Sequence, residues 1–258
     1  MKRTLIPAAT VSLIPVVVLP VMLKAQSTQP WPMPHAASLG GSGDYLSVPS
    51  APELQNAEEL AIEAWIRPSF LSNGRVVSKG DGITGTSARS YDITYLGDGR
   101  IRLEFFVNPV GTEGYVPMET TNSYLPEEWT HIAAVFSSAL GEAALYVNGA
   151  LAARRTTTHL GVPLRGLKIR QTSLPVTMGY TPSWDSTWFE GEIDEVRIWS
   201  RWKAHIEIRA DMCGQLDHVP GLEAAWHFDR HWYDFTGLHH GTPYGLASFV
   251  FLDRGWCD

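Results

Sequence analysis

The sequence has no surplus of positive charge and lacks two common motifs of nucleotide-binding and hydrolytic enzymes. Lys and Arg total 20 against 27 Asp and Glu, which gives a formal net charge of −7 at pH 7. Duplex nucleic acid needs a basic surface, so this balance argues against it as a partner. No Walker loop or Gly-x-Ser-x-Gly elbow is present, so neither of these motifs indicates nucleotide phosphate binding or serine hydrolysis.

Cysteine is also scarce, because Cys213 and Cys257 are the only two in the chain. In an exported protein an even pair suggests one disulfide. Closing the loop between them would contribute about 4 kcal/mol in the chain-entropy model. Two free buried thiols are the alternative.

The composition is that of a folded protein, with 44% hydrophobic and 18% charged residues, which excludes a disordered chain and provides for a sizeable core. A length of 258 residues allows one large all-β domain or two small domains. No short repeat divides the chain, and one domain is the simpler interpretation.

Residues 1–25 are typical of an export signal. Lys2 and Arg3 precede an uncharged apolar run that ends at Leu23, and Ala25 offers a small residue before a cut. The run is also long enough for an uncleaved anchor, although its prolines would interrupt a helix. We expect cleavage, and hence a secreted or cell-surface protein, extracellular or periplasmic, without a membrane span.

The next segment, residues 26–38, is rich in proline and shows no clear periodicity. We predict that it is a linker and that residues 39–258 form the folded domain.

The stretch Trp188–Trp199 alternates as a β-strand does. Strict alternation would place Ile193 and Glu195 on one face and Asp194 and Val196 on the other. A carboxylate at Asp194, in the middle of a sheet, must be exposed at a rim, paired, or bound to a metal.

This stretch, Trp-Phe-Glu-Gly-Glu-Ile-Asp-Glu-Val-Arg-Ile-Trp, resembles the late strand of laminin G-like and pentraxin-like jelly rolls in the concanavalin A-like lectin/glucanase superfamily. Other segments resemble that family in the same order: 41–49 (GSGDYLSVP), 60–68 (LAIEAWIRP), 75–81 (RVVSKGD), 125–136 (LPEEWTHIAAVF), 145–151 (LYVNGAL), 221–229 (GLEAAWHFD) and 234–242 (DFTGLHHGT). The resemblance implies an all-β fold, an antiparallel jelly-roll β-sandwich, with one short helix near residues 203–212.

Three acidic residues of the late strand, Glu192, Asp194 and Glu195, raise the question of catalysis. Glucanase relatives carry Glu-x-Asp-x-x-Glu or Glu-x-Asp-x-Glu, and the retaining mechanism needs two carboxyl groups about 5–5.5 Å apart. Here Val196 and Arg197 occupy the positions of the last acid. We therefore expect no enzyme activity; a glycoside hydrolase of the glucanase or sialidase-related type is the alternative.

The resemblance also implies a structural calcium ion, since hard oxygen ligands suit Ca²⁺. The family places it on the Asp of the late strand, which is Asp194 here, together with backbone oxygens. Asp44, in the first strand, could lie beside it. The alternative is that Asp194 only accepts hydrogen bonds from loop amides.

The loop 180–188 has the composition of a sugar-binding site, because it combines aromatic rings with short polar side chains. The candidates are Tyr180, Trp184, Asp185 and Trp188. The alternative is that this loop packs on the edge of its own domain. The sequence thus predicts a secreted, non-catalytic module that recognises carbohydrate or an extracellular protein; a purely structural or adhesive domain is the third possibility.

Overall fold

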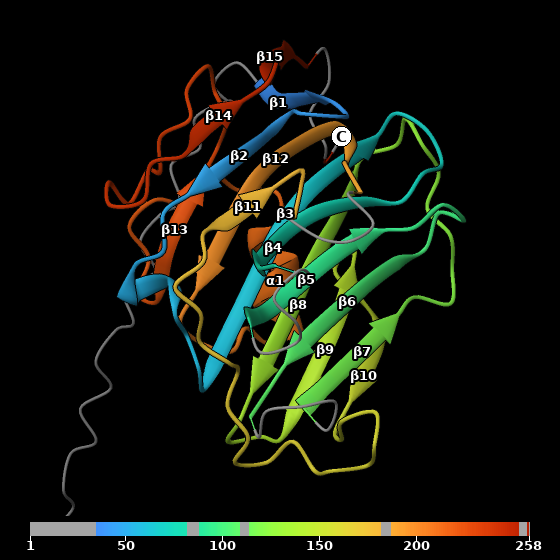
Figure 1. The fold of residues 1–258 in the computed structure, drawn as a ribbon, viewed down its shortest axis with the longest axis vertical. Helices are drawn as coiled ribbons and strands as arrows, with labels where there is room; N and C mark the ends of the chain where they lie inside the picture. Colours follow the sequence, from blue (N-terminus) through green and yellow to red (C-terminus); the bar gives the residue numbers. More distant parts are fainter. Residues whose placement is uncertain (1–34, 82–87, 109–113, 182–186, 253–256, 258) are drawn as a thin grey trace, which may run out of the picture. The chain divides into compact units, whose positions relative to one another are not determined.

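The structure, a computed structural model, describes residues 35–81, 88–108, 114–181, 187–252 and 257, and the following description applies to these (Figure 1). The strands, in chain order, are β1 (His35–Gly40), β2 (Tyr45–Val48), β3 (Glu59–Pro68), β4 (Gly74–Gly80), β5 (Arg89–Tyr95), β6 (Ile101–Phe106), β7 (Tyr115–Glu119), β8 (Thr130–Ser137), β9 (Glu142–Val147), β10 (Ala150–Arg155), β11 (Val176–Met178), β12 (Glu190–Trp199), β13 (Leu222–Trp226), β14 (Thr242–Tyr244) and β15 (Ser248–Phe251). Within the same ranges, the α-helix is α1 (His205–Asp211) and a 3₁₀ turn, η1, covers Pro52–Leu54.

The strands form two antiparallel sheets, which we call sheet A and sheet B. Sheet A has the order β10-β9-β8-β3-β12-β1-β15, with β13 paired to β12, and sheet B has the order β14-β2-β11-β4-β5-β6-β7. In Figure 1, sheet B lies in front of sheet A. The predicted all-β jelly-roll sandwich is therefore confirmed. The short helix also occurs where the sequence predicts it.

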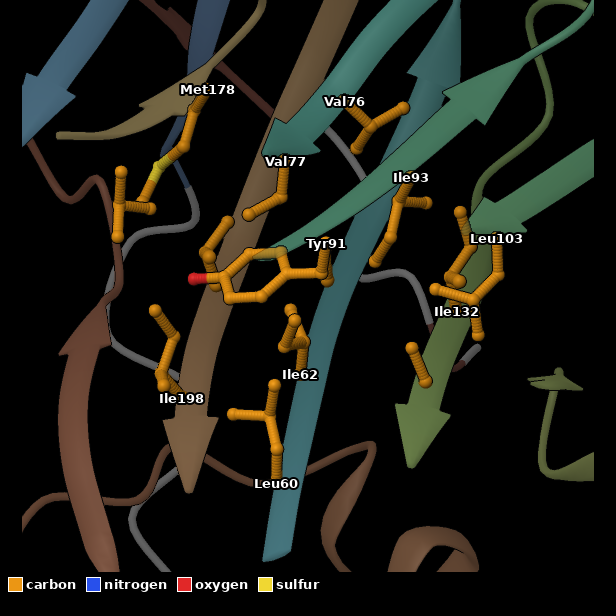
Figure 2. Packing of buried hydrophobic residues seen from close by; sticks show 14 of the residues in the cluster. Leu60, Ile62, Val76, Val77, Tyr91, Ile93, Leu103, Ile132, Met178 and Ile198 are labelled. Atoms are coloured by element: carbon orange, nitrogen blue, oxygen red, sulfur yellow. The ribbon is translucent and has the colours of Figure 1, made fainter. Parts of the chain in front are cut away.

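The hydrophobic core lies between the two sheets. Leu60 and Ile62 of β3 point from sheet A toward Val77 and Ile93 of sheet B, and all four are almost fully buried (Figure 2). Alternate residues of each strand supply this face because side chains in a strand point to opposite sides in turn. Burying each such aliphatic side chain contributes roughly 1.5–3 kcal/mol to stability.

Strand β12 departs from strict alternation. Ile193, Val196 and Ile198 all belong to the core, and the pairing with β3 shifts by one residue after Asp194. Glu195 takes up the extra residue with a φ of 48°. This β-bulge corrects the prediction from alternation, because one added residue exchanges the two faces of the strand beyond it.

Two turns follow local sequence signals. Asn148 and Gly149, with φ of 48° and 70°, connect β9 to β10, as expected for an Asn-Gly hairpin. Gly191 lies where a Cβ atom would be 2.3 Å from the carbonyl oxygen of Arg67. This close approach of two backbones explains the glycine.

The outer face of sheet A is covered by α1 and nearby segments. Ile208 of α1 packs with Trp199, Ala133 and Leu222 in a second, smaller hydrophobic cluster. No helix within the described ranges is long and apolar enough to cross a membrane.

The folded domain begins a few residues earlier than the sequence predicts. β1 begins at His35 and pairs with both β12 and β15, so residues 35–38, predicted as the end of a linker, belong to the sandwich. The predicted disulfide is present: Cys213 is joined to Cys257, with 5.8 Å between their Cα atoms.

Candidate functional site

The outer face of sheet B carries polar side chains in its middle. In β5, Ile93 points into the core, so its neighbours Asp92 and Thr94 point away from it. In β6, Leu103 points inward and Glu104 outward for the same reason. Asp92 and Glu104 are directly opposite each other in the β5–β6 register.

Two arginines neutralise these opposed carboxylates. Arg75 donates from Nη1 to Asp92 Oδ2 at 2.8 Å and to Thr94 Oγ1 at 3.0 Å, and Arg89 Nη2 lies 2.8 Å from the same Asp92 oxygen. Glu104 Oε2 is 3.6 Å from Arg75 and 3.8 Å from Arg89. We call Arg75, Arg89, Asp92 and Glu104 the charged cluster. Buried carboxylates require such partners, because an unpaired buried charge is very costly.

The environment of the charged cluster changes the acidity of its members. Burial raises the pKa of Asp92, which is 1% exposed; Arg75 and Arg89 oppose the rise and Glu104 adds to it. The hydroxyl of Tyr115 donates to Glu104 Oε1. Burial, followed by the charge of Glu104, raises the pKa of Tyr115, so this phenol stays a hydrogen-bond donor at neutral pH.

Four aromatic rings gather at one end of the same sheet. Tyr180 and Trp188 are stacked, with centroids 3.8 Å apart and an interplanar angle of 9°. Tyr45 and Tyr244 are stacked at 4.5 Å and 6°. Tyr45 links the two pairs, since its ring lies 5.3 Å from Tyr180 and 5.9 Å from Trp188. We call these four residues the aromatic cluster.

Arg75 connects the aromatic cluster to the charged cluster. Its backbone forms an isolated bridge with Trp188, and its Nε donates to Thr187 Oγ1 at 3.1 Å. The same guanidinium binds Asp92 and Thr94. The aromatic cluster and the charged cluster are thus connected through Arg75 on the same face of sheet B.

The structure brings together only some of the residues that the sequence singles out for sugar binding. Tyr180 and Trp188 are neighbours, and each uses one ring face on the other. Trp184 and Asp185 lie outside the described residues. Sequence analysis missed Tyr45 and Tyr244, because their contact depends on the β2–β14 register, which pairs them directly.

The two predicted calcium ligands are placed apart. Asp44 accepts hydrogen bonds from the amides of Gly40 at 2.8 Å and Leu246 at 2.6 Å. Gly40 pairs with Glu190 of β12, so Asp194 lies about 13 Å further along that strand at ~3.3 Å per residue.

Asp194 itself is buried, and its Oδ1 accepts the Glu195 amide at 2.9 Å. In the part of the chain that the structure describes, no group of three or more His, Cys, Asp or Glu is arranged to hold a metal. The Glu195 amide bound by Asp194 fits the alternative in which the Asp194 carboxylate accepts hydrogen bonds from backbone amides. Calcium stays a prediction.

The acidic residues of β12 lie on the outer face of sheet A, away from the aromatic cluster. The Glu192 carboxylate is 3.2 Å from Arg67. Glu195 accepts from Arg197 Nη2 at 2.7 Å, and His227 Nδ1 is 2.9 Å from its carboxylate. Burial alone would raise the pKa of Glu195, but the charges of His227 and Arg197 outweigh it and lower the pKa.

Comparison with known proteins agrees with this architecture. A family model, described as the concanavalin A-like lectin/glucanases superfamily, matches residues 40–209. Among curated proteins, none matches this sequence.

Several solved structures share the fold. A Bacteroides ovatus ATCC 8483 protein proposed to bind carbohydrate is 20% identical over 88% of this chain, with a TM-score of 0.68; the match spans 62% of that protein's length. A heptameric SAP-like pentraxin from Limulus polyphemus is 15% identical over 86% of this chain and 93% of its own, with a TM-score of 0.54.

A third solved structure is the CBM40 module of the Ruminococcus gnavus IT-sialidase bound to α2,3 sialyllactose. It is 14% identical over 68% of this chain and 95% of its own, with a TM-score of 0.53.

Proposed function

Because this chain belongs to the concanavalin A-like lectin/glucanases superfamily, we propose that it is a secreted, non-catalytic module that binds carbohydrate through the outer face of sheet B. The observation that carries the proposal is the aromatic cluster beside the charged cluster, joined through Arg75.

Sugars offer an apolar C–H face and a rim of hydroxyl groups, and this surface offers a partner for each. Tyr244 is 45% exposed, and the other three residues of the aromatic cluster are partly exposed, so part of this aromatic area is accessible to an apolar sugar face. Binding sites generally combine such apolar area with a few fixed polar groups. The hydroxyl of Tyr45, on the same face, provides one.

The proposal that the module is non-catalytic is supported by the β12 carboxylates, which are already paired with basic side chains. Glu195 is held by Arg197 and His227, and Glu192 is paired with Arg67. Retaining hydrolysis needs one carboxylate free to attack and one that can donate a proton at the sugar. These acids lie on the sheet opposite to the aromatic cluster.

Secretion is supported by the disulfide between Cys213 and Cys257, because disulfides persist in oxidising compartments. The signal-like residues 1–25 point the same way. The partner in this proposal is a glycan, free or displayed on an extracellular protein. A calcium ion at Asp194 would stabilise the sandwich rather than contact the glycan.

Affinity electrophoresis on gels that contain a panel of polysaccharides would test the proposal. We expect at least one polysaccharide to retard the wild type, and we expect Tyr244→Ala to lose most of that retardation. The matched control is Tyr233→Ala, which removes a somewhat more exposed tyrosine (59% against 45% exposed) whose ring contacts His231 and His240 instead. No retardation by any glycan, or equal loss in both variants, would contradict the proposal.

An assay for new reducing ends on the same polysaccharides tests the non-catalytic part. We expect none to appear. Release of reducing ends that Glu192→Gln abolishes would establish a hydrolase instead.

A further inference from the structure

We infer that the glycan recognised at the outer face of sheet B is neutral rather than acidic. This inference rests on the proposed function and adds the chemical class of the ligand. It follows from how the charges on this face are distributed and paired.

The half of the face that carries the aromatic cluster has little charge of its own. The strands β2, β11 and β14 contain no charged residue. The accessible hydroxyl groups here are those of Ser47 and Thr242, which are opposite each other in the β2–β14 register. The hydroxyls of Ser78 and Thr177 are buried and lie 3.0 Å from each other. Hydroxyl groups both donate and accept hydrogen bonds, as those of a neutral sugar do.

In the other half, every outward guanidinium of β4 to β6 has a protein carboxylate as its partner. Arg75 and Arg89 share Asp92 and Glu104. Arg102 lies 2.6 Å from Glu119 of the edge strand β7, and Arg100, just before β6, pairs with the same Glu119 at 2.6 Å and with Asp98 at 2.7 Å. With Arg100 and Asp98 included, four guanidiniums therefore face four carboxylates, and these described strands and their turn present no excess of positive charge.

The remaining cation of these strands does not change the balance. Lys79 of β4 is opposite Tyr91 and Val176, which belong to the core, so it shares their inner face. Its Nζ contacts Ser50 Oγ at 2.8 Å and the Leu174 carbonyl at 2.9 Å.

An acidic sugar would have to displace a protein carboxylate from its arginine. Asp92 is 1% and Glu104 7% exposed, so the displaced group would become a buried charge without its partner, which is strongly unfavourable. The net charge of −7 on the whole chain adds a long-range repulsion of anions. A neutral sugar meets neither obstacle.

Paired charges still give a neutral sugar something specific to bind. A guanidinium has five N–H donors and a carboxylate has several acceptor positions, so each pair keeps capacity beyond the bond between its members. Hydrogen bonds to charged groups are stronger than those between neutral groups. Of these pairs, Arg102 and Glu119 are the more accessible, with side chains 38% and 30% exposed.

The test uses native affinity gels that contain neutral β-glucan, neutral mannan, polygalacturonate or hyaluronate, run at low ionic strength. The wild type should be retarded by a neutral polysaccharide and not by the two acidic ones. Preferential retardation by an acidic polysaccharide would overturn the inference while leaving the proposed function intact. Absence of retardation by all four would remove both.

Glu104→Gln tests the role of charge pairing directly, because it leaves Arg75 and Arg89 with one carboxylate fewer. We expect the ratio of acidic to neutral affinity to rise at least about tenfold, which corresponds to one charge-assisted hydrogen bond, and to fall again with added salt. Glu119→Gln does the same for Arg100 and Arg102 at a more exposed position and keeps the test available if Glu104→Gln does not fold.

The matched control is Glu142→Gln. It removes the same charge from a carboxylate that pairs with Arg154 on sheet A, so it changes the net charge but not the outer face of sheet B. An equal gain in acidic affinity in this control, or no gain in either sheet B variant, would show that pairing on this face does not set the ligand class.

Discussion

The ammonium group of Lys203 lies 3.1 Å from both carboxylate oxygens of Glu63, on the outer face of sheet A. Neither side chain is exposed. The same ammonium is 2.8 Å from Asp211 Oδ2 and 4.0 Å from the centroid of the Trp199 ring. This arrangement satisfies a buried cation with two carboxylates and an aromatic face.

Lys203→Met should lower the free energy of unfolding by up to about 3–5 kcal/mol, because Glu63 stays buried and keeps the Trp199 indole at 2.9 Å and the more distant Arg197 at 4.0 Å in place of the ammonium at 3.1 Å. Urea denaturation would measure the change. Lys168→Met is the control, since Lys168 pairs with Glu58 at the surface and exposed pairs contribute at most about 1 kcal/mol. Equal effects of the two substitutions would contradict the interpretation.

His227 should make stability depend on pH. Its Nδ1 is 2.9 Å from the Glu195 carboxylate and its Nε2 is 3.0 Å from Asp217 Oδ1. Burial would lower its pKa, but Glu195 and Asp217 together outweigh burial and raise the pKa above 6.5. The stabilisation by protonated His227 is therefore fully present below pH 6.5, the unfolded value, and is lost as pH rises through the folded pKa.

Melting temperatures of the wild type and His227→Gln across this pH range would measure the effect. The difference between the two should shrink as pH rises. His218→Gln, which changes an exposed histidine, controls for the loss of an imidazole. A difference that is constant with pH would show that His227 does not change its charge there.

The disulfide should be a large part of the stability of this fold. Cys213 and Cys257 are 44 residues apart, and closing such a loop is worth about 4 kcal/mol in the chain-entropy model. Reduction should lower the urea midpoint of the wild type and have no effect on Cys213→Ser/Cys257→Ser. Thiol titration of the unreduced, denatured protein should find no free thiol. Two reactive thiols would show that the disulfide does not form.

Calcium at Asp194 remains testable by ligand removal. An ion at 100 times its dissociation constant would add about 2.7 kcal/mol to the stability of the native state. EDTA should then lower the melting temperature of the wild type, and Asp194→Asn should behave like the wild type in EDTA and respond little to added calcium. If EDTA leaves the wild-type curve unchanged, Asp194 has a structural role that includes its hydrogen bond from the Glu195 amide.

Local chemistry in the sequence determined much of the fold. Alternating apolar residues predicted the strands that became β3 and β12, and the Asn148-Gly149 pair predicted a hairpin that the structure contains. These features depend on residues close together in the chain, where the geometry of one strand or turn decides the outcome. The two cysteines were paired correctly because no other partner exists.

The candidate site was decided only by the tertiary structure. Tyr45 and Tyr244 are separated by about two hundred residues and meet because β14 pairs with β2, which no local pattern encodes. The bulge at Glu195 exchanged the faces of β12 by adding one residue. Asp92 and Glu104 are ordinary acids in the sequence, and become a paired, buried cluster only because Arg75 and Arg89 arrive from β4 and the start of β5. Strand register and long-range pairing set these contacts, and both are properties of the assembled sandwich.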